Sequence, residues 1–210
     1  MKKIIKTYPL KNIFNAILKR AFDIVFSLFV LVFFLSWMYP LFALIIKLQS
    51  RGPAVYKQLR EGKDGVHFLC FKFRTMYLNK ESDYSWTKVN DPRVTRFGVF
   101  LRRTSLDEFP QFLNVFLGQM SIVGPRPHPI KLNDLYRDRI EKFHLRHKTR
   151  PGITGLAQMK GYRGSISKIH QINSRVKLDR FYIHNWTFLL DLKIILLTIP
   201  ATIHWGLTRK

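Results

Sequence analysis

One apolar run near the N-terminus constrains this chain more than any other feature. It extends from Ala21 to Ile46 and is interrupted by Asp23, Ser27 and Ser36. A helix of this length can cross the hydrocarbon core of a bilayer. A cleavable signal peptide fits less well, because the run is too long and no small-x-small cleavage motif follows it.

Basic residues flank this run on both sides, and no acidic residue precedes it. They are Lys2, Lys3, Lys6, Lys11, Lys19 and Arg20 before the run, and Lys47, Arg51, Lys57 and Arg60 after it. Basic residues beside membrane segments favour the cytoplasmic side, so both ends of the run are expected there. A straight span cannot satisfy this, whereas a helix that enters the membrane and returns can.

Pro40 supplies a place for such a helix to turn. Its ring removes one helical hydrogen bond and clashes with the preceding turn. Ser36, four residues earlier, can bond a carbonyl group that is freed there. We therefore predict a re-entrant membrane helix that is broken at Pro40. A spanning helix kinked at Pro40 remains the alternative, because prolines are tolerated in spanning helices.

Charge and hydrophobic content together narrow the class of partner. Lys and Arg number 36 against 13 Asp and Glu, which gives the 210-residue chain a formal net charge of +23. This charge predicts anionic partners such as phospholipid headgroups, nucleic acid or phosphorylated substrates. Because 47% of residues are hydrophobic, the chain is not a disordered basic tail, and a membrane surface is favoured over free nucleic acid. The single cysteine, Cys70, excludes a disulfide framework, indicates a reducing compartment and stands in an apolar run typical of a buried side chain.

The remaining pattern predicts a mixed α+β fold that is mainly helical. Two short strands, 54–56 and 66–73, flank a turn at Gly62–Gly65. Apolar spacing predicts a helix over 109–117 that ends at Gly118. Elsewhere we expect a short helix or a strand and turn over 94–103, a polar loop over 79–90, a charged surface helix over 131–148, a glycine-rich loop over 150–164 and a helix over 166–186.

The last apolar stretch, 188–205, differs from a membrane span. Its interruptions are Asp191, Lys193 and Pro200. They predict an amphipathic helix in the membrane interface, with Trp186 and Trp205 as anchors, and a core helix is the alternative. The chain thus divides into a basic N-terminus with the re-entrant helix (1–50), a cytoplasmic catalytic domain (51–187) and a C-terminal interfacial helix (188–210).

The densest group of reactive side chains lies in the segment from Arg102 to Pro110, where Asp107 and Glu108 are adjacent. A carboxylate can attack phosphorus, magnesium binds through one or two carboxylates plus substrate phosphates, and arginine contacts phosphate. The alternative is structural. Ser105-x-x-Glu108 has the form of a capping box, and Asp107 can itself begin a helix with Pro110 in the first turn.

Two loops offer further phosphate contacts. In Gly124-Pro125-Arg126-Pro127, the prolines restrict the backbone and either hold Arg126 in place or form a rigid turn with a solvated arginine. In the segment from Arg150 to Gly155, glycines permit close backbone approach to a phosphate. Neither loop matches a Walker or dinucleotide fingerprint.

Taken together, these motifs resemble the bacterial sugar transferase family, the monotopic phosphoglycosyl transferases. The resemblance runs from Lys19 to Thr198. Its elements are Lys19-Arg20-x-x-Asp23, Pro40, Gly52-Pro53, Gln58-x-Arg60-x-Gly62, Phe71-Lys72-Phe73-Arg74-Thr75-Met76, Asp91-Pro92-Arg93-Val94-Thr95, Leu101 to Glu108 with Pro110-Gln111, Asn114-Val115, Gly118, Met120-Ser121, Val123 to Pro127, Arg150 to Gly155, and Asp179. Gln119 departs from the family, which commonly has an acidic residue there.

The resemblance implies a two-step transfer at a magnesium-dependent site. Asp107 attacks the β-phosphate of a UDP-sugar, releases UMP and holds the phosphosugar, which polyprenyl phosphate then takes. Glu108 holds Mg²⁺. Lys72, Arg102, Arg126 and Arg150 bind phosphates, Asp179 is a further acidic residue of the site without an assigned role, and Pro40 marks the family's re-entrant helix. An ordinary aspartate pKa leaves Asp107 ionised at neutral pH without a base.

The resemblance also implies location and partners. The enzyme is expected in the bacterial inner membrane with its catalytic domain on the cytoplasmic face, at the first membrane step of a surface glycan pathway that builds exopolysaccharide, O-antigen or capsule. Anionic lipids are expected partners and nucleic acid is not. A homo-oligomer is compatible with the sequence but does not follow from it. The chain resembles a minimal form that lacks the N-terminal multi-span domain of longer members.

One group of residues resembles the subgroup that uses UDP-glucose or UDP-galactose: His128, Asn133-x-x-Tyr136-Arg137, Gly161-Tyr162-Arg163-Gly164 and Asn185-Trp186. The alternative function is a catalytically inactive, basic, membrane-associated interaction protein. Such a protein has no need for adjacent carboxylates among arginines. A nucleic-acid binder is a second alternative, against which the apolar run argues.

Overall fold

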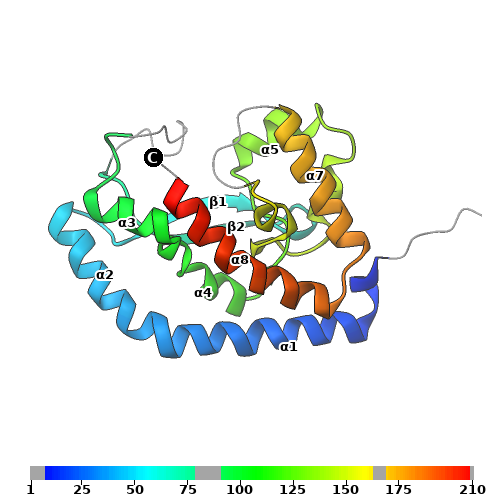
Figure 1. The fold of residues 1–210 in the computed structure, drawn as a ribbon, viewed down its shortest axis with the longest axis horizontal. Helices are drawn as coiled ribbons and strands as arrows, with labels where there is room; N and C mark the ends of the chain where they lie inside the picture. Colours follow the sequence, from blue (N-terminus) through cyan, green and yellow to red (C-terminus); the bar gives the residue numbers. More distant parts are fainter. Residues whose placement is uncertain (1–7, 79–90, 163–168, 209–210) are drawn as a thin grey trace, which may run out of the picture.

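The computed structural model describes residues 8–78, 91–162 and 169–208, without the side chains after residue 202. The fold is mainly helical with two small sheets, so the predicted α+β class is confirmed (Figure 1). In chain order the elements are η1 (Pro9–Lys11), α1 (Ile13–Val30), η2 (Leu31–Leu35), α2 (Ser36–Gln49), β1 (Val55–Glu61), η3 (Lys63–Gly65), β2 (His67–Phe73), α3 (Arg96–Thr104), η4 (Leu106–Glu108), α4 (Gln111–Phe116), β3 (Ser121–Val123), α5 (Ile130–Arg137), η5 (Phe143–Lys148), β4 (Gly152–Thr154), α6 (Leu156–Met159), α7 (Ile169–His184) and α8 (Phe188–Thr208).

The N-terminal apolar run forms one long helix from α1 through α2. Its halves run in different directions beneath the rest of the molecule (Figure 1). The chain stays helical through Pro40, so the predicted break is not an interruption of helical structure. A π-helical turn, η2, precedes Ser36, whose amide bonds the Leu31 carbonyl. The Ser36 hydroxyl donates to the Val32 carbonyl at 2.5 Å. Ser36 therefore bonds a carbonyl group as predicted, but that carbonyl belongs to the π-helical turn.

One face of this long helix packs against the body in two stretches, on either side of the π-helical turn η2. The buried residues recur at intervals of three or four through most of the helix: Lys19, Asp23, Ser27, Val30, Met38, Phe42 and Ile46. The opposite face exposes large apolar side chains, for example Phe29, Phe33 and Leu44. Within the described part of the chain, Ile13–Gln49 is the helix long and apolar enough to cross a membrane by length and composition.

Two strand pairs organise the body. β1 and β2 form an antiparallel hairpin with register from Val55↔Phe73 to Glu61↔His67, and Cys70 is buried in it, as predicted. β3 and β4 pair in parallel. The predicted loop over 150–164 is therefore wrong in part, because it contains β4 and α6. Gly152 is required there, since a Cβ atom would lie 2.1 Å from the Gly124 nitrogen.

Three apolar clusters fill the body. The largest joins β2 and β3 to α7 and α8, a second joins α5 and η5 to α7, and a third joins α2 to β2 and α3. The third cluster contains Phe42, Phe73 and Leu101. It therefore holds the far half of the long helix to β2, which carries Lys72, and to α3, which leads into the segment with Asp107 and Glu108.

Several predicted helices match and one does not. The structure has helices within 94–103, 109–117, 166–186 and 188–205, as predicted or as one of the two alternatives. The single helix predicted over 131–148 is wrong, because α5 and η5 are separated by a turn in which Lys142 has φ 60°. Trp186 is 3% exposed and packs in the core, so it is not a membrane anchor. The polar loop predicted over 79–90 and the side chain of Trp205 lie outside the described residues.

Candidate active site

The adjacent carboxylates lie in a tight connection between two helices. The Thr95 side chain caps α3 by accepting from the Gly98 amide. The helix ends at Ser105, which adopts the left-handed conformation with φ 59°. The next turn, η4, carries Asp107 and Glu108, and neither Ser105 nor Pro110 makes a side-chain capping bond. The capping interpretation of this segment is therefore wrong, and both carboxylates are available for other contacts.

Glu108 receives two cations from different parts of the chain. Lys72 of β2 donates to its Oε1 atom at 2.5 Å. Arg126, three residues after β3, contacts both carboxylate oxygens, at 3.1 and 2.5 Å. Burial opposes the charge on Glu108, but the attraction of Arg126 and Lys72 outweighs it and holds its pKa well below the ordinary value of 4.5. Glu108 is therefore a fixed anion that orients both cations.

Asp107 lies beside this network without joining it. Its half-buried carboxylate has no hydrogen bond or ion pair among the described residues. Burial raises its pKa from 3.8 to about 6, and Glu108 adds to the rise, whereas Lys72, Arg102 and Arg126 oppose it. The expectation of an ordinary pKa is thus wrong. The group is still mostly ionised above neutral pH, but it is poorly compensated.

Arg102 reaches the site from α3. Its Nε atom donates to the Thr75 hydroxyl at 2.7 Å. The two segments approach closely because Gly98 faces Thr75, whose carbonyl oxygen would lie 2.1 Å from a Cβ atom at Gly98. The structure therefore brings together Asp107, Glu108, Lys72, Arg102 and Arg126 of the predicted set.

Arg150 lies outside this direct network. Its Nε atom donates to the Gly118 carbonyl at 2.8 Å, beyond the end of α4. The next residue, Pro151, bonds through its carbonyl to the Ser121 amide. In this structure Arg150 thus holds the connection from α4 to β3.

Asp179 lies in a second buried network behind Arg126. It is 2% exposed and accepts from Arg146 at 3.1 and 3.0 Å. Arg146 also donates to the Arg126 carbonyl at 2.7 Å. Burial raises the pKa of Asp179 although Arg146 and Arg175 oppose the rise. Asp179 therefore contacts the site through Arg146 and the backbone of Arg126.

Sequence reasoning missed Arg146 and Arg175, which complete this second network. They contact the two ring nitrogens of His128, at 2.6 and 3.0 Å. Burial and the neighbouring arginines hold the pKa of His128 well below 6.5, so the ring is neutral. Burial also lowers the pKa of Arg175 to about 9. No local signal could have found Arg146, because it lies in a segment with the composition of a surface helix.

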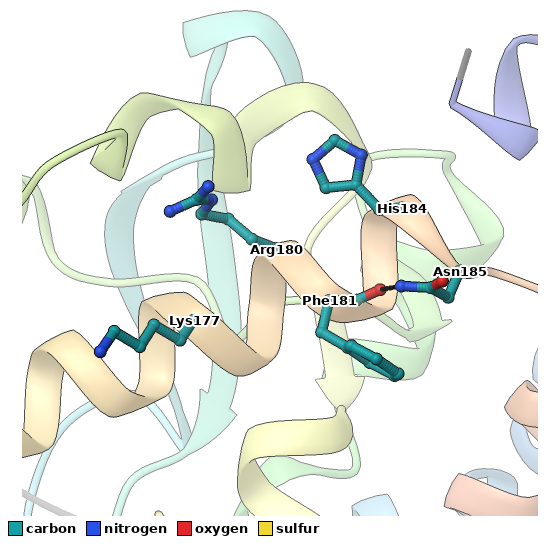
Figure 2. A pocket seen from close by; sticks show the side chains of 5 residues that line it. All are labelled: Lys177, Arg180, Phe181, His184 and Asn185. Carbon is teal, nitrogen blue, oxygen red and sulfur yellow. Dashed lines mark hydrogen bonds between the residues drawn. The ribbon is translucent and has the colours of Figure 1, made fainter. Parts of the chain in front are cut away.

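The pocket of about 400 Å³ on α7 is a different feature. It is lined by Lys177, Arg180, Phe181, His184 and Asn185. Figure 2 shows that these side chains point in different directions, and that the Asn185 amide bonds back to the Phe181 carbonyl. A ligand would not meet converging polar groups there, so the pocket has no feature of an active site.

The chemistry of the Asp107 site follows from its charges. Among the described residues there is no cluster of three or more metal-ligating side chains of the His, Cys, Asp and Glu types. The adjacent carboxylates of Asp107 and Glu108 are candidate ligands for a cation. A partly buried, poorly compensated carboxylate beside three cations is suited to attack an anionic phosphorus, because the cations offset the repulsion between the two anions.

The chain is similar to one group of bacterial proteins along nearly its whole length. A family model described as bacterial sugar transferase matches residues 14–205. A UDP-glucose:undecaprenyl-phosphate glucose-1-phosphate transferase of Escherichia coli (strain K12) is 48% identical, over 91% of this chain and 41% of that protein. A protein of the same name from Caulobacter vibrioides is 41% identical, over 92% of this chain and 72% of that protein. The exopolysaccharide production protein PSS of Rhizobium leguminosarum bv. phaseoli is 43% identical, over 91% of this chain and 98% of that protein. The chain thus spans about two fifths of the length of the E. coli relative.

Proposed function

The chain belongs to the bacterial sugar transferase family, and we propose that it transfers a sugar 1-phosphate from a UDP-sugar to polyprenyl phosphate. The products are UMP and a polyprenyl diphosphate sugar. The observation that carries the proposal is the Asp107 carboxylate, half-buried and unpaired beside Glu108, Lys72 and Arg126. By contrast, the buried carboxylates of Asp23, Asp179 and Asp191 each accept hydrogen bonds, the last two from a cation.

The proposed reaction has two displacements at one phosphorus atom. In the first, an Asp107 oxygen attacks the β-phosphorus, and the bond between that phosphorus and the bridging oxygen breaks, so that UMP leaves with the electron pair. In the second, an oxygen of polyprenyl phosphate attacks the same phosphorus and the aspartate carboxylate leaves. Aspartyl phosphates are established covalent intermediates in phosphoryl transfer. Because the aspartate is used as an anion, the first step needs no proton acceptor.

The cations of the site have distinct proposed roles. Arg126 and Lys72 contact Glu108 and are close enough to Asp107 to act on its charge, so they stabilise the negative charge that gathers on the phosphates. Arg102 is held by Thr75 and acts on Asp107 from α3. Asp179 positions Arg126 through Arg146.

A magnesium ion fits this donor set. Mg²⁺ binds through one or two carboxylates and completes its shell with substrate phosphates and water. Both oxygens of Glu108 contact protein cations, so Glu108 would exchange one of these contacts for the ion. Burial raises the pKa of Asp107 although Lys72, Arg102 and Arg126 oppose the rise, and a bound cation would oppose it further. When bound, the ion supplies charge neutralisation for the phosphates.

The long helix supports a re-entrant rather than a spanning arrangement. Its 37 residues correspond to about 55 Å of helix, well beyond the roughly 30 Å of a hydrocarbon core. Lys19 near its start and Ile46 near its end are both buried against the same body. A perpendicular span would draw that body into the bilayer. We therefore propose that both ends stay at the cytoplasmic surface of the inner membrane and the exposed apolar face meets lipid.

The relatives favour glucose as the transferred sugar. The proteins of E. coli and C. vibrioides are named UDP-glucose:undecaprenyl-phosphate glucose-1-phosphate transferases. We propose the same donor and acceptor for this chain, with UDP-galactose as the alternative donor. The residues that resemble this subgroup include His128 and Tyr136. Both are buried, so we expect them to support the residues of the site and not to contact the sugar directly.

The test is UMP release by the purified protein in nanodiscs with Mg²⁺, a panel of UDP-sugars and a short polyprenyl phosphate. We expect turnover with UDP-glucose that requires the lipid, stops when EDTA removes the metal and is lost in Asp107→Asn. Asp134→Asn is the matched control, because this exposed carboxylate lies on α5. Full activity of Asp107→Asn would contradict the nucleophile, and absence of UMP from every donor would favour the inactive interaction protein.

A further inference from the structure

Three polar residues in the first half of the long helix face the body of the protein. Lys19, Arg20 and Asp23, which we call the α1 polar triplet, lie within little more than one turn of α1. Lys19 is 6% exposed and Asp23 is 1% exposed. Charged side chains are almost never buried unless they are paired. Their partners therefore indicate what the triplet does.

Asp23 and Lys19 hold strand β3. The Oδ1 atom of Asp23 accepts from the Ser121 hydroxyl at 3.0 Å and from the Ile122 amide at 2.9 Å. Lys19 donates to the carbonyl of Val123, the last residue of β3, at 3.0 Å. It also pairs with Asp191 of α8 at 2.6 Å. β3 is thus bonded along its length to α1, and Arg126 follows it by three residues.

Arg20 holds the end of α4. It donates to the carbonyls of Val115 and Phe116, both at 2.7 Å. The last carbonyls of a helix lack intrahelical partners and carry partial negative charge, so an arginine there is well placed. α4 begins shortly after Glu108. The α1 polar triplet therefore contacts both ends of the segment 115–123, which connects the carboxylate pair to Arg126.

We propose that the α1 polar triplet positions Arg126 against Glu108, with Asp23 as its central positioning residue. The proposal rests on the proposed function, since it concerns the reaction at Asp107. Arg126 contacts both oxygens of Glu108, and a shift of about 1 Å in the loop that follows β3 is enough to disturb a contact of this geometry. The helix that meets the membrane thereby sets the distance between the carboxylates and their main cation.

Ser27 provides a matched control for Asp23. It lies one turn farther along the same buried face and is 0% exposed, but its hydroxyl bonds the Ile24 carbonyl within α1. Ser27→Ala therefore disturbs the same face without changing the contacts of segment 115–123. Ser121→Ala is a milder variant than Asp23→Ala, because it removes one of the two bonds to Asp23 and leaves the Ile122 bond.

The experiment measures UMP release in a single turnover with enzyme in excess, so that slow variants are still quantified. A double-mutant cycle with Arg126→Ala identifies the residue through which Asp23 acts. We expect Asp23→Ala to slow release about tenfold and Ser121→Ala about threefold in the wild-type background, and Ser27→Ala to have no effect. In the Arg126→Ala background, Asp23→Ala should slow release by less than about twofold.

Each outcome separates this inference from the proposed function. Equal losses from Asp23→Ala with and without Arg126 would overturn the inference, because they would show a general effect on folding. Unchanged rates in both Asp23→Ala and Ser121→Ala would also overturn it. If Asp23→Ala fails to fold, the Ser121→Ala cycle with Arg126→Ala decides by the same criterion. A wild-type protein that releases no UMP would instead refute the proposed function.

Discussion

Replacing Asp107 by asparagine should abolish UMP release and at the same time stabilise the protein at neutral pH. Burial, with help from Glu108, raises the pKa of Asp107 from 3.8 to about 6. Because the folded pKa lies above the unfolded value, the native state favours the protonated form. The stabilisation is complete below pH 3.8 and is lost as the pH rises through about 6. At neutral pH the folded protein therefore carries a charge that it would be more stable without.

The magnitude follows from the two pKa values. One pKa unit corresponds to 1.36 kcal/mol, so a rise from 3.8 to about 6 costs the folded state at most about 3 kcal/mol at pH 7.5. Screening by solvent at this half-buried position reduces the figure. Asparagine keeps the shape and removes the charge. For a chain of this size, recovery of the full amount would raise the Tm by roughly 6–12 °C.

Thermal unfolding of wild type and Asp107→Asn in identical nanodiscs measures the effect. The variant should have the higher Tm at about pH 7.5, and the difference should shrink as the pH falls toward about 4. Asp134→Asn, at a side chain that is 61% exposed, should show little difference at either pH. A variant that is no more stable at pH 7.5, or a difference that does not depend on pH, would refute the claim that burial strains the Asp107 charge.

Three further substitutions test other contacts. Glu108→Gln removes a negative charge that raises the pKa of Asp107, so the acid limb of the pH–rate profile for UMP release should move to lower pH while the rate falls about tenfold or more. Lys19→Met leaves Asp191, which is 1% exposed, without its cation. Denaturant unfolding should show that the free energy of unfolding falls by about 3–5 kcal/mol, and adding Asp191→Asn should recover part of this loss. Gly98→Ala would place a Cβ atom 2.1 Å from a backbone carbonyl oxygen and should destabilise by about 1–3 kcal/mol, measured as a lower Tm together with slower UMP release.

Local residue patterns predicted the elements that depend on neighbouring residues. The second strand, β2, was predicted nearly in full beside a glycine turn, whereas the first was predicted over 54–56 and in fact runs to Glu61. The helices α4 and α7 follow from apolar spacing, and α8 follows from an apolar stretch with polar interruptions. The pattern failed where a distant contact decides the structure. β4 is three residues long, and it is a strand because Gly152 lies against β3. The residues of this glycine-rich segment do not indicate that it pairs with a strand some thirty residues earlier in the chain.

The candidate site divides in the same way. Asp107 and Glu108 could be found from the sequence because they are adjacent in a chain with few acids. Arg126 was a candidate from its proline-flanked loop, whereas Lys72 came with the family resemblance. They reach Glu108 from the loop after β3 and from β2. Arg146 could not be found, since its burial depends on packing between η5 and α7. Burial of polar groups is the property that a single sequence conveys least.

The contacts of the other buried carboxylates support the proposal that Asp107 is the reactive one. In a chain with a net charge of +23, cations are abundant, and the buried Asp179 and Asp191 each bond one directly. Glu108 takes two. Asp107 lies near the same cations but bonds none of the described residues. A group from outside the protein can therefore bind its carboxylate. In the proposed reaction, a metal bound with the donor diphosphate would supply positive charge beside Asp107, and it would offset the unfavourable charge of that carboxylate as the phosphorus to be attacked arrives.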